Sequence, residues 1–185
     1  MRIIAGTHRG RKLKAPDTIA TRPILDQQKE SLFNILREAF PCPGVLDIFA
    51  GSGALGFEAL SRGAEMATFV ERGREALTAL RENMETLDLK SRARIVVADA
   101  LRLDPSRLEH PYTVAFLDPP FPLVTAETAR LAELLDRVLR GRAEDDEGCV
   151  MLRVPTAFHR TGAASWPGDC FDQRTFGESH VLLLR

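Results

Sequence analysis

The sequence predicts an α/β protein built on a mostly parallel sheet, and three observations support this prediction. From Pro43 onward, short apolar segments alternate with segments of helical periodicity. A glycine-rich turn joins the first apolar segment to a helix. The composition is that of a globular protein, with 44% hydrophobic and 28% charged residues in a chain of 185. Strict alternation of strands and helices implies a parallel sheet that is covered by helices on both faces.

The elements before Pro43 differ from those that follow. Residues 2–14 are expected to form a short strand pair, and a loop through Pro23 follows it. Apolar residues at helical spacing predict a helix over 27–39, with Asp26 as its N-cap and Pro41 just beyond its end. We therefore divide the chain into a basic N-terminal extension, residues 1–40, and a main domain, residues 41–185.

The main domain is expected to contain seven strands. The predicted strands are 45–49, 66–71, 93–98, 113–117, 149–154, 171–174 and 179–184, and the predicted helices between them are 54–61, 74–87 and 126–139. The last two strands flank Gly177 and are expected to form an antiparallel hairpin at the edge of the sheet.

Several classes of protein are excluded by simple features of the sequence. No apolar run approaches the ~20 residues that a membrane helix needs, and no secretory signal is recognisable, so we expect a cytoplasmic protein. The three cysteines, Cys42, Cys149 and Cys170, form no CxxC pair. They favour buried, reduced thiols over disulfides or a zinc site, and no metal is expected.

Charge is distributed unevenly along the chain. Residues 1–25 carry six basic side chains and one acidic side chain, a net charge of +5, whereas the rest of the chain carries −6. The spaced cations Arg9, Arg11, Lys12, Lys14 and Arg22 suit a strip that lies along nucleic-acid phosphates. A solubilising tail is the alternative that charge alone leaves open.

The glycine-rich turn predicts a ligand site. The segment 47–56 reads DIFAGSGALG, and ligands of open α/β sheets bind outside the carboxyl ends of such strands. Asp47 lies inside the strand, where it would repel a pyrophosphate and attract the sulfonium and ammonium groups of S-adenosylmethionine. The residues expected to contact this cofactor are Asp47, Phe49, Ala50, Gly51, Ser52 and Gly53.

Two further acidic residues complete an adenosine-shaped site. Glu71 ends the second strand 18 residues after Gly53, where a carboxylate that binds ribose hydroxyls is expected. Asp99 and Ala100 follow the third strand, and the Asp99 carboxylate can accept from an adenine amino group.

The strongest motif is Asp118-Pro119-Pro120-Phe121, at the end of the fourth strand. Two prolines stiffen the turn and remove N–H donors. Asp118 and the Pro119 carbonyl can then hold the two hydrogens of an exocyclic amine, while Phe121 offers a ring on which a base can stack. This arrangement would aim the lone pair of the amine at a methyl carbon.

With these motifs the chain resembles the bacterial family of 16S ribosomal RNA guanine-N2 methyltransferases. The resemblance rests on Arg2 to Gly6, Arg9 to Leu13, Arg22-Pro23, Asp26, Glu30, Leu32 to Asn34, the glycine turn with Glu58 to Arg62, and Asp118 to Phe121. It implies a Rossmann-like class I methyltransferase fold, S-adenosylmethionine as cofactor and a role for Asp118 to Phe121 in catalysis.

The chain departs from the family pattern in the extension. Ile24 stands where the family usually has threonine, and Gln27 and Lys29 replace two arginines expected near the cofactor mouth. Contacts at these positions cannot be carried over from the family.

We therefore expect a monomeric enzyme that methylates the N2 amine of a guanine in 16S ribosomal RNA, in the 30S subunit or an assembly intermediate. Methylation of another amine, on adenine or on a protein glutamine, stays open. So does a non-catalytic RNA-binding domain.

Overall fold

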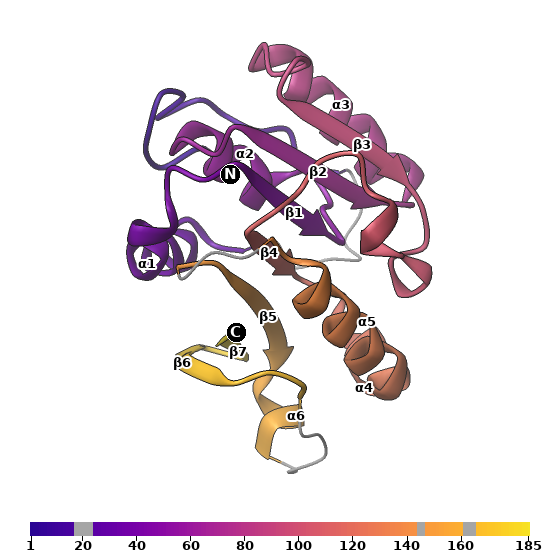
Figure 1. Cartoon of the computed structure of the whole chain (residues 1–185). Helices are drawn as coiled ribbons and strands as arrows, with labels where there is room; N and C mark the ends of the chain where they lie inside the picture. Colours follow the sequence, from indigo (N-terminus) through magenta and orange to yellow (C-terminus); the bar gives the residue numbers. More distant parts are fainter. Residues whose placement is uncertain (17–23, 144–146, 161–165) are drawn as a thin grey trace.

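The computed structural model describes residues 1–16, 24–143, 147–160 and 166–185 (Figure 1). One sheet of seven strands has the order β3-β2-β1-β4-β5-β7-β6. The strands are β1 (Gly44–Ile48), β2 (Met66–Glu71), β3 (Ala93–Val97), β4 (Val114–Leu117), β5 (Cys149–Pro155), β6 (Cys170–Phe176) and β7 (Ser179–Leu184). The first five strands are parallel and the last two add antiparallel pairs, as the sequence predicts.

Helices cover both faces of the sheet because strand side chains alternate between two apolar clusters. Phe116 of β4 packs in the cluster that receives α1 (Asp26–Ile35), α2 (Ala54–Ser61) and α3 (Arg74–Thr86). Its neighbours Ala115 and Leu117 pack in the opposite cluster, with α5 (Thr128–Gly141). Figure 1 shows α4 (Phe121–Ala126) beside α5 on that second face.

The strand register places the predicted site residues at one edge of the sheet. Ile48 of β1 pairs with Val70 of β2 and with Leu117 of β4. Phe49, Glu71 and Asp118, each one residue further along, therefore meet at the carboxyl ends of adjacent strands.

The N-terminal residues are not the strand pair that the sequence predicts. They form a single antiparallel bridge, Arg2 to Lys12, around a series of turns that includes Gly6 at φ +81°. Ile3 and Leu13 are buried in the cluster that also holds Val45. The extension thus shares a hydrophobic core with residues 41–185, and the division into two units stays a prediction.

Three helix predictions need correction. Asp26 is the first residue of α1 rather than its N-cap, which is Leu25, and the end of the predicted helix is a 3₁₀ turn, η1 (Leu36–Ala39). The predicted helix over 126–139 corresponds to α5, which begins and ends two residues later, and a break at Glu127 separates it from the short helix α4, which was not predicted. A short helix, α6 (Thr156–Arg160), follows β5 and was not predicted.

Two short 3₁₀ turns, η2 (Ala100–Arg102) and η3 (Pro105–Arg107), follow β3. Cys42 and Cys149 are buried as expected, whereas Cys170 is exposed because it lies on the edge strand β6. No described helix has the length and apolar character needed to span a bilayer.

Candidate active site

A cavity of about 870 Å³ opens at the carboxyl ends of β1, β2 and β4. It brings together eleven of the residues predicted to bind cofactor or to act in catalysis. These are Asp47, Phe49, Ala50, Gly51, Ser52, Glu71, Ala100, Asp118, Pro119, Pro120 and Phe121. Its size is in the range of small-molecule sites.

The glycine turn forms one wall of this cavity through unusual backbone geometry. Phe49, Gly51 and Gly53 all have positive φ, at 63°, 58° and 81°. A Cβ on Gly51 would meet no atom within 4 Å, so this part of the backbone borders open space. Gly53 does not line the cavity, and a Cβ there would lie 2.5 Å from the Phe57 ring, so close packing requires glycine here and the predicted cofactor contact stays a prediction.

Asp47 is a buried carboxylate at the base of the cavity, with 2% exposure. Its Oδ2 accepts a 2.9 Å hydrogen bond from the backbone N–H of Gly56 in α2. Burial raises its pKa well above the usual value, the Gly56 bond opposes this, and the charges of Asp118 and Glu71 add to the increase. A cationic ligand would relieve this concentration of negative charge.

Glu71 binds three backbone N–H groups around the cavity. Its Oε2 accepts from Gly51 N–H at 2.9 Å, and its Oε1 accepts from Arg72 and Gly73 N–H at 2.8 and 2.7 Å. A carboxylate has about four acceptor positions, so about one is left to accept from a ribose hydroxyl. Glu71 therefore also holds the glycine turn in place.

Asp99 does not line the cavity, although Ala100 does. The Asp99 carboxylate caps η2 by accepting from Leu101 N–H at 3.2 Å, and it pairs with Arg72 Nη1 at 3.2 Å. The contact predicted between Asp99 and adenine thus stays untested, and the residue has a local structural role.

The Asp118–Phe121 turn forms the opposite wall and contacts a residue that sequence reasoning missed. Arg153 of β5 donates from Nε to Asp118 Oδ1 at 2.5 Å, and its guanidinium carbon lies 5.5 Å from the centre of the Phe121 ring. Burial raises the pKa of Asp118, and the positive charge of Arg153 opposes that rise. The signal in the sequence was the lone arginine within the apolar strand CVMLRVP.

The comparisons with known proteins agree with this geometry. A family model described as "Conserved hypothetical protein 95" matches residues 1–185. Ribosomal RNA small subunit methyltransferase D of Haemophilus influenzae is 43% identical over 132 residues, which cover 70% of this chain and 68% of that protein. The chain belongs to this methyltransferase family.

Other family members and solved structures are similar as well. The Escherichia coli K12 methyltransferase D is 44% identical over 121 residues, and the match covers 65% of this chain and 60% of that protein. The structure of YhhF from Escherichia coli has a TM-score of 0.78 at 33% identity, and the match covers 99% of this chain and 96% of that chain. A hypothetical protein of Thermus thermophilus gives 0.76 at 31% identity, with 100% and 98% covered. The Rossmann-like class I methyltransferase fold is confirmed.

The cofactor of this methyltransferase class is S-adenosylmethionine, and the cavity fits it. The cofactor carries a sulfonium and an ammonium cation, and the carboxylates of Asp47, Glu71 and Asp118 all border the cavity. The open space beside Gly51 leaves room for a ligand against the backbone of the turn.

The extension of this family member also reaches the cofactor cavity. Met1, Pro16 and Ile24 line it, and Ser52 Oγ lies 3.8 Å from Met1 Sδ. Asn83 of α3 accepts from Lys14 N–H at 2.7 Å and donates to the carbonyls of Lys14 and Ser52 at 2.9 and 3.0 Å. One buried amide thus joins the extension to the glycine turn, a link that no sequence motif indicated.

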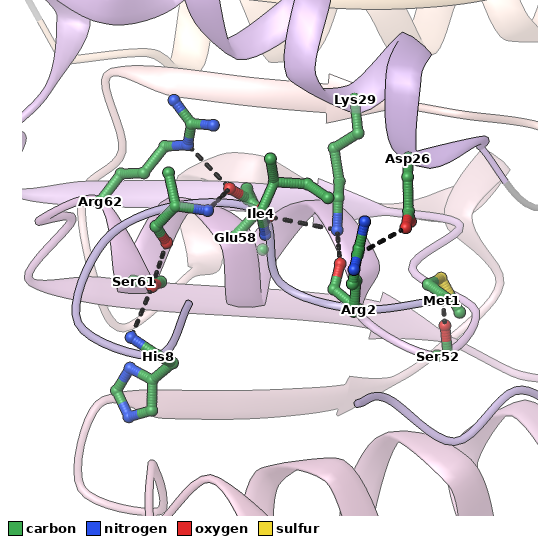
Figure 2. A network of polar contacts seen from close by, with 12 residues as sticks. Met1, Arg2, Ile4, His8, Asp26, Lys29, Ser52, Glu58, Ser61 and Arg62 are labelled. Carbon is green, nitrogen blue, oxygen red and sulfur yellow. Dashed lines mark hydrogen bonds and ion pairs between the residues drawn. The ribbon is translucent and has the colours of Figure 1, made fainter. Parts of the chain in front are cut away.

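A buried polar network holds the extension against α2 (Figure 2). Glu58 accepts from the N–H groups of Ile4 and Ala5 at 2.8 and 3.0 Å and pairs with Arg62 at 2.8 Å. Its other partner is Lys29, which also donates to the Arg2 carbonyl at 2.6 Å. From the sequence we expect the position of Lys29 near the cofactor mouth. Lys29 is instead fully buried in this network. Gln27 is not among the cavity residues either.

The predicted RNA-binding cations differ in their ion-pair partners. Arg9, Arg11 and Lys12 are exposed, and within the described part of the chain no ion pair involves them. Lys14 pairs with Glu82 at 2.6 Å. Arg22 lies outside the described residues.

Proposed function

We propose that this chain transfers a methyl group from S-adenosylmethionine to the exocyclic N2 of a guanine in 16S ribosomal RNA. The observation that carries the proposal is the Asp118–Phe121 turn on the wall of the cavity bordered by Asp47 and Glu71. We propose further that the enzyme acts in the cytoplasm, as a monomer, on the 30S subunit or an assembly intermediate.

The chemistry available to the bound cofactor is donation of a methyl group from its sulfonium. In this proposal Asp118 Oδ2 accepts an N–H of the target amine, and the bond from Arg153 to Oδ1 supports this assignment. The carbonyl of Pro119 can accept the second N–H, because the proline turn leaves acceptors but few donors. Fixing both hydrogens orients the amine lone pair, and proximity supplies much of the rate.

The proton that the amine loses after transfer also needs an acceptor. We assign this role to the Asp118 carboxylate, which borders the cavity, because burial raises its pKa and makes it a better base than an exposed carboxylate. Neither a metal nor a covalent nucleophile enters this sequence of steps.

The acceptor base must leave its stacked or paired position to reach Asp118, at a cost of a few kcal/mol. Contacts of Arg9, Arg11 and Lys12 with phosphates would offset this cost. These cations are exposed, as phosphate contacts require.

The direct experiment uses wild-type protein, methyl-labelled S-adenosylmethionine, and 30S particles, naked 16S RNA or ribosomal proteins as acceptors. We expect label on one guanine of 16S RNA, located by mass spectrometry of nuclease fragments. Asp118→Ala is expected to lose most turnover and to bind the cofactor nearly as well as wild type. Label on adenine or glutamine would contradict the guanine assignment, and absence of cofactor binding would favour the non-catalytic alternative.

A further inference from the structure

Arg153 brings a positive charge into the cavity wall from a strand that carries no methyltransferase motif. The residue is 7% exposed and borders the cavity beside the Asp118–Phe121 turn. Its Nε lies 2.5 Å from Asp118 Oδ1, and its guanidinium carbon lies 5.5 Å from the centre of the Phe121 ring. One side chain therefore contacts both ends of the turn.

We infer that Arg153 is a positioning residue for methyl transfer, which fixes the Asp118 carboxylate through one oxygen and leaves the other for the acceptor amine. Among the described residues, no hydrogen bond reaches Asp118 Oδ2. Because Oδ1 is held, the carboxyl plane cannot rotate freely, and Oδ2 keeps one direction. The role given to Asp118 toward the acceptor rests on the proposed function.

The charge of Arg153 matters as much as its geometry. Two carboxylates, Asp47 from β1 and Glu71 from the end of β2, border the same cavity as Asp118. Burial raises the pKa of Asp118, and Arg153 lowers it. Without this guanidinium, Asp118 would keep its proton to higher pH, and a protonated carboxyl would lose an acceptor that the amine needs.

The guanidinium plane has a second effect, on Phe121. An arginine that lies over one side of a ring fixes the ring and occupies that side. A base that stacks on Phe121 must then take the opposite side. Lysine would supply charge without the planar contact, so it should replace Arg153 only in part.

The test compares Arg153→Met, Arg153→Lys and a matched control, Arg140→Met, which removes an exposed arginine paired with Asp136 on α5. Methyl transfer to 30S particles is measured at saturating cofactor across pH 5–9. For Arg153→Met we expect kcat to fall about 10- to 100-fold, cofactor affinity to change less than about threefold, and the acid limb to move to higher pH. Arg153→Lys should keep the acid limb near that of wild type and recover part of kcat. The control should behave as wild type.

Two outcomes would overturn the inference: an acid limb that stays in place in Arg153→Met, or equal losses in the methionine and lysine variants. If Arg153→Met does not fold, the double variant Asp118→Asn/Arg153→Met removes the unpaired buried charge. The double variant should then turn over within about twofold of Asp118→Asn alone, because the two residues act as one unit. If instead the double variant lost much more activity than Asp118→Asn alone, Arg153 would act on a group other than Asp118.

Failure of the proposed function can be distinguished from failure of the role proposed for Arg153. If the wild type methylates another acceptor, the same pH profiles are measured on that acceptor. A carboxyl ¹³C NMR titration of Asp118 in wild type and Arg153→Met needs no acceptor at all. An Asp118 titration that is the same in Arg153→Met and wild type would overturn the positioning role whatever the substrate.

Discussion

Lys29 and Glu58 form an ion pair with an Nζ–Oε2 distance of 3.2 Å, and neither side chain is exposed to solvent. Burial lowers the pKa of Lys29, while the charge and hydrogen bond of Glu58 counteract this. The pair joins α1 directly to α2. Both side chains also bind the first residues of the chain, because Lys29 donates to the Arg2 carbonyl and Glu58 accepts from the N–H groups of Ile4 and Ala5.

We expect Glu58→Ala to lower the free energy of unfolding by about 3–5 kcal/mol, since the ammonium of Lys29 would stay buried without its carboxylate. Urea denaturation measures this change. Glu38→Ala is the matched control, because Glu38 pairs with Arg37 on the surface and should cost less than about 1 kcal/mol. Equal effects in the two variants would contradict a special role for the buried pair.

Asp47→Asn is expected to stabilise the fold at neutral pH and to weaken cofactor binding. The pKa of Asp47 is raised in the folded state, so its contribution to stability is fully present below the unfolded value of 3.8 and is lost as pH rises through the folded value. Asparagine keeps an acceptor for Gly56 N–H and has no charge to bury. Thermal unfolding between pH 4 and 8 should show that the free energy of unfolding of Asp47→Asn increases relative to that of wild type as pH rises. The difference should be on the order of 1 kcal/mol at pH 7. If the difference in stability between Asp47→Asn and wild type became smaller with rising pH, the raised pKa of Asp47 would be wrong.

Glu71→Ala is expected to weaken S-adenosylmethionine binding by about 1–3 kcal/mol, as measured by calorimetry. Two causes add here: the ribose hydroxyls lose an acceptor, and the N–H groups of Gly51 and Gly73 lose the carboxylate that holds their loops. Glu85→Ala, at an exposed ion pair with Lys90, should bind the cofactor as wild type does. Unchanged affinity in Glu71→Ala would rule out both roles.

The exposed cations of the extension give a prediction about salt. Replacing Arg9, Arg11 and Lys12 by alanine should weaken RNA binding and reduce the slope of log K against log salt concentration by roughly 0.7–0.9 per lost contact. Lys90→Ala is the control for nonspecific loss of charge, since Lys90 lies near the far end of α3. An unaltered slope in the triple variant would leave the extension a solubilising role only.

Asn83→Asp should weaken cofactor binding by about 1–2 kcal/mol, although Asn83 does not line the cavity. The carboxylate would still accept from Lys14 N–H, but it could not donate to the carbonyls of Lys14 and Ser52. Glu82→Gln removes the neighbouring Lys14 ion pair and leaves this amide clamp intact, so calorimetry should find it unchanged. The extension would then support the cofactor site in addition to any contact with RNA.

Periodicity was sufficient to predict the sheet, because strands buried on both faces are continuous apolar runs and the helices between them repeat every 3.6 residues. Helix ends were less predictable. Asp26 has the side chain of an N-cap, but its carboxylate binds Arg2 at 3.1 Å and the helix begins one residue earlier than expected. The short helix α4 and the two-residue shift of α5 leave no trace in the apolar pattern on which the prediction over 126–139 rested.

Some residues of the candidate site could be predicted from the sequence and others could not. Residues that follow consecutive strands, such as Asp47, Glu71 and Asp118, could be predicted because parallel strands bring their carboxyl ends together. Arg153 and Asn83 could not, since each acts through contacts between elements far apart in sequence: 35 residues separate Arg153 from Asp118, and 69 separate Asn83 from Lys14. Neither belongs to a motif.

The distances along the chain within the Glu58 network also bear on the order of folding. Ile4 and Ala5 are synthesised 54 and 53 residues before Glu58, and Lys14 is synthesised 69 residues before Asn83. At ~5–20 residues per second, Lys14 waits roughly 3–14 seconds on the ribosome before its partner exists. Ile3 and Leu13 are apolar and buried in the final fold, and during this interval much of the cluster that buries them has not been synthesised. We therefore expect the extension to dock only after α3 has been synthesised, and the part of the cavity wall that Met1 and Pro16 form to be completed at that step.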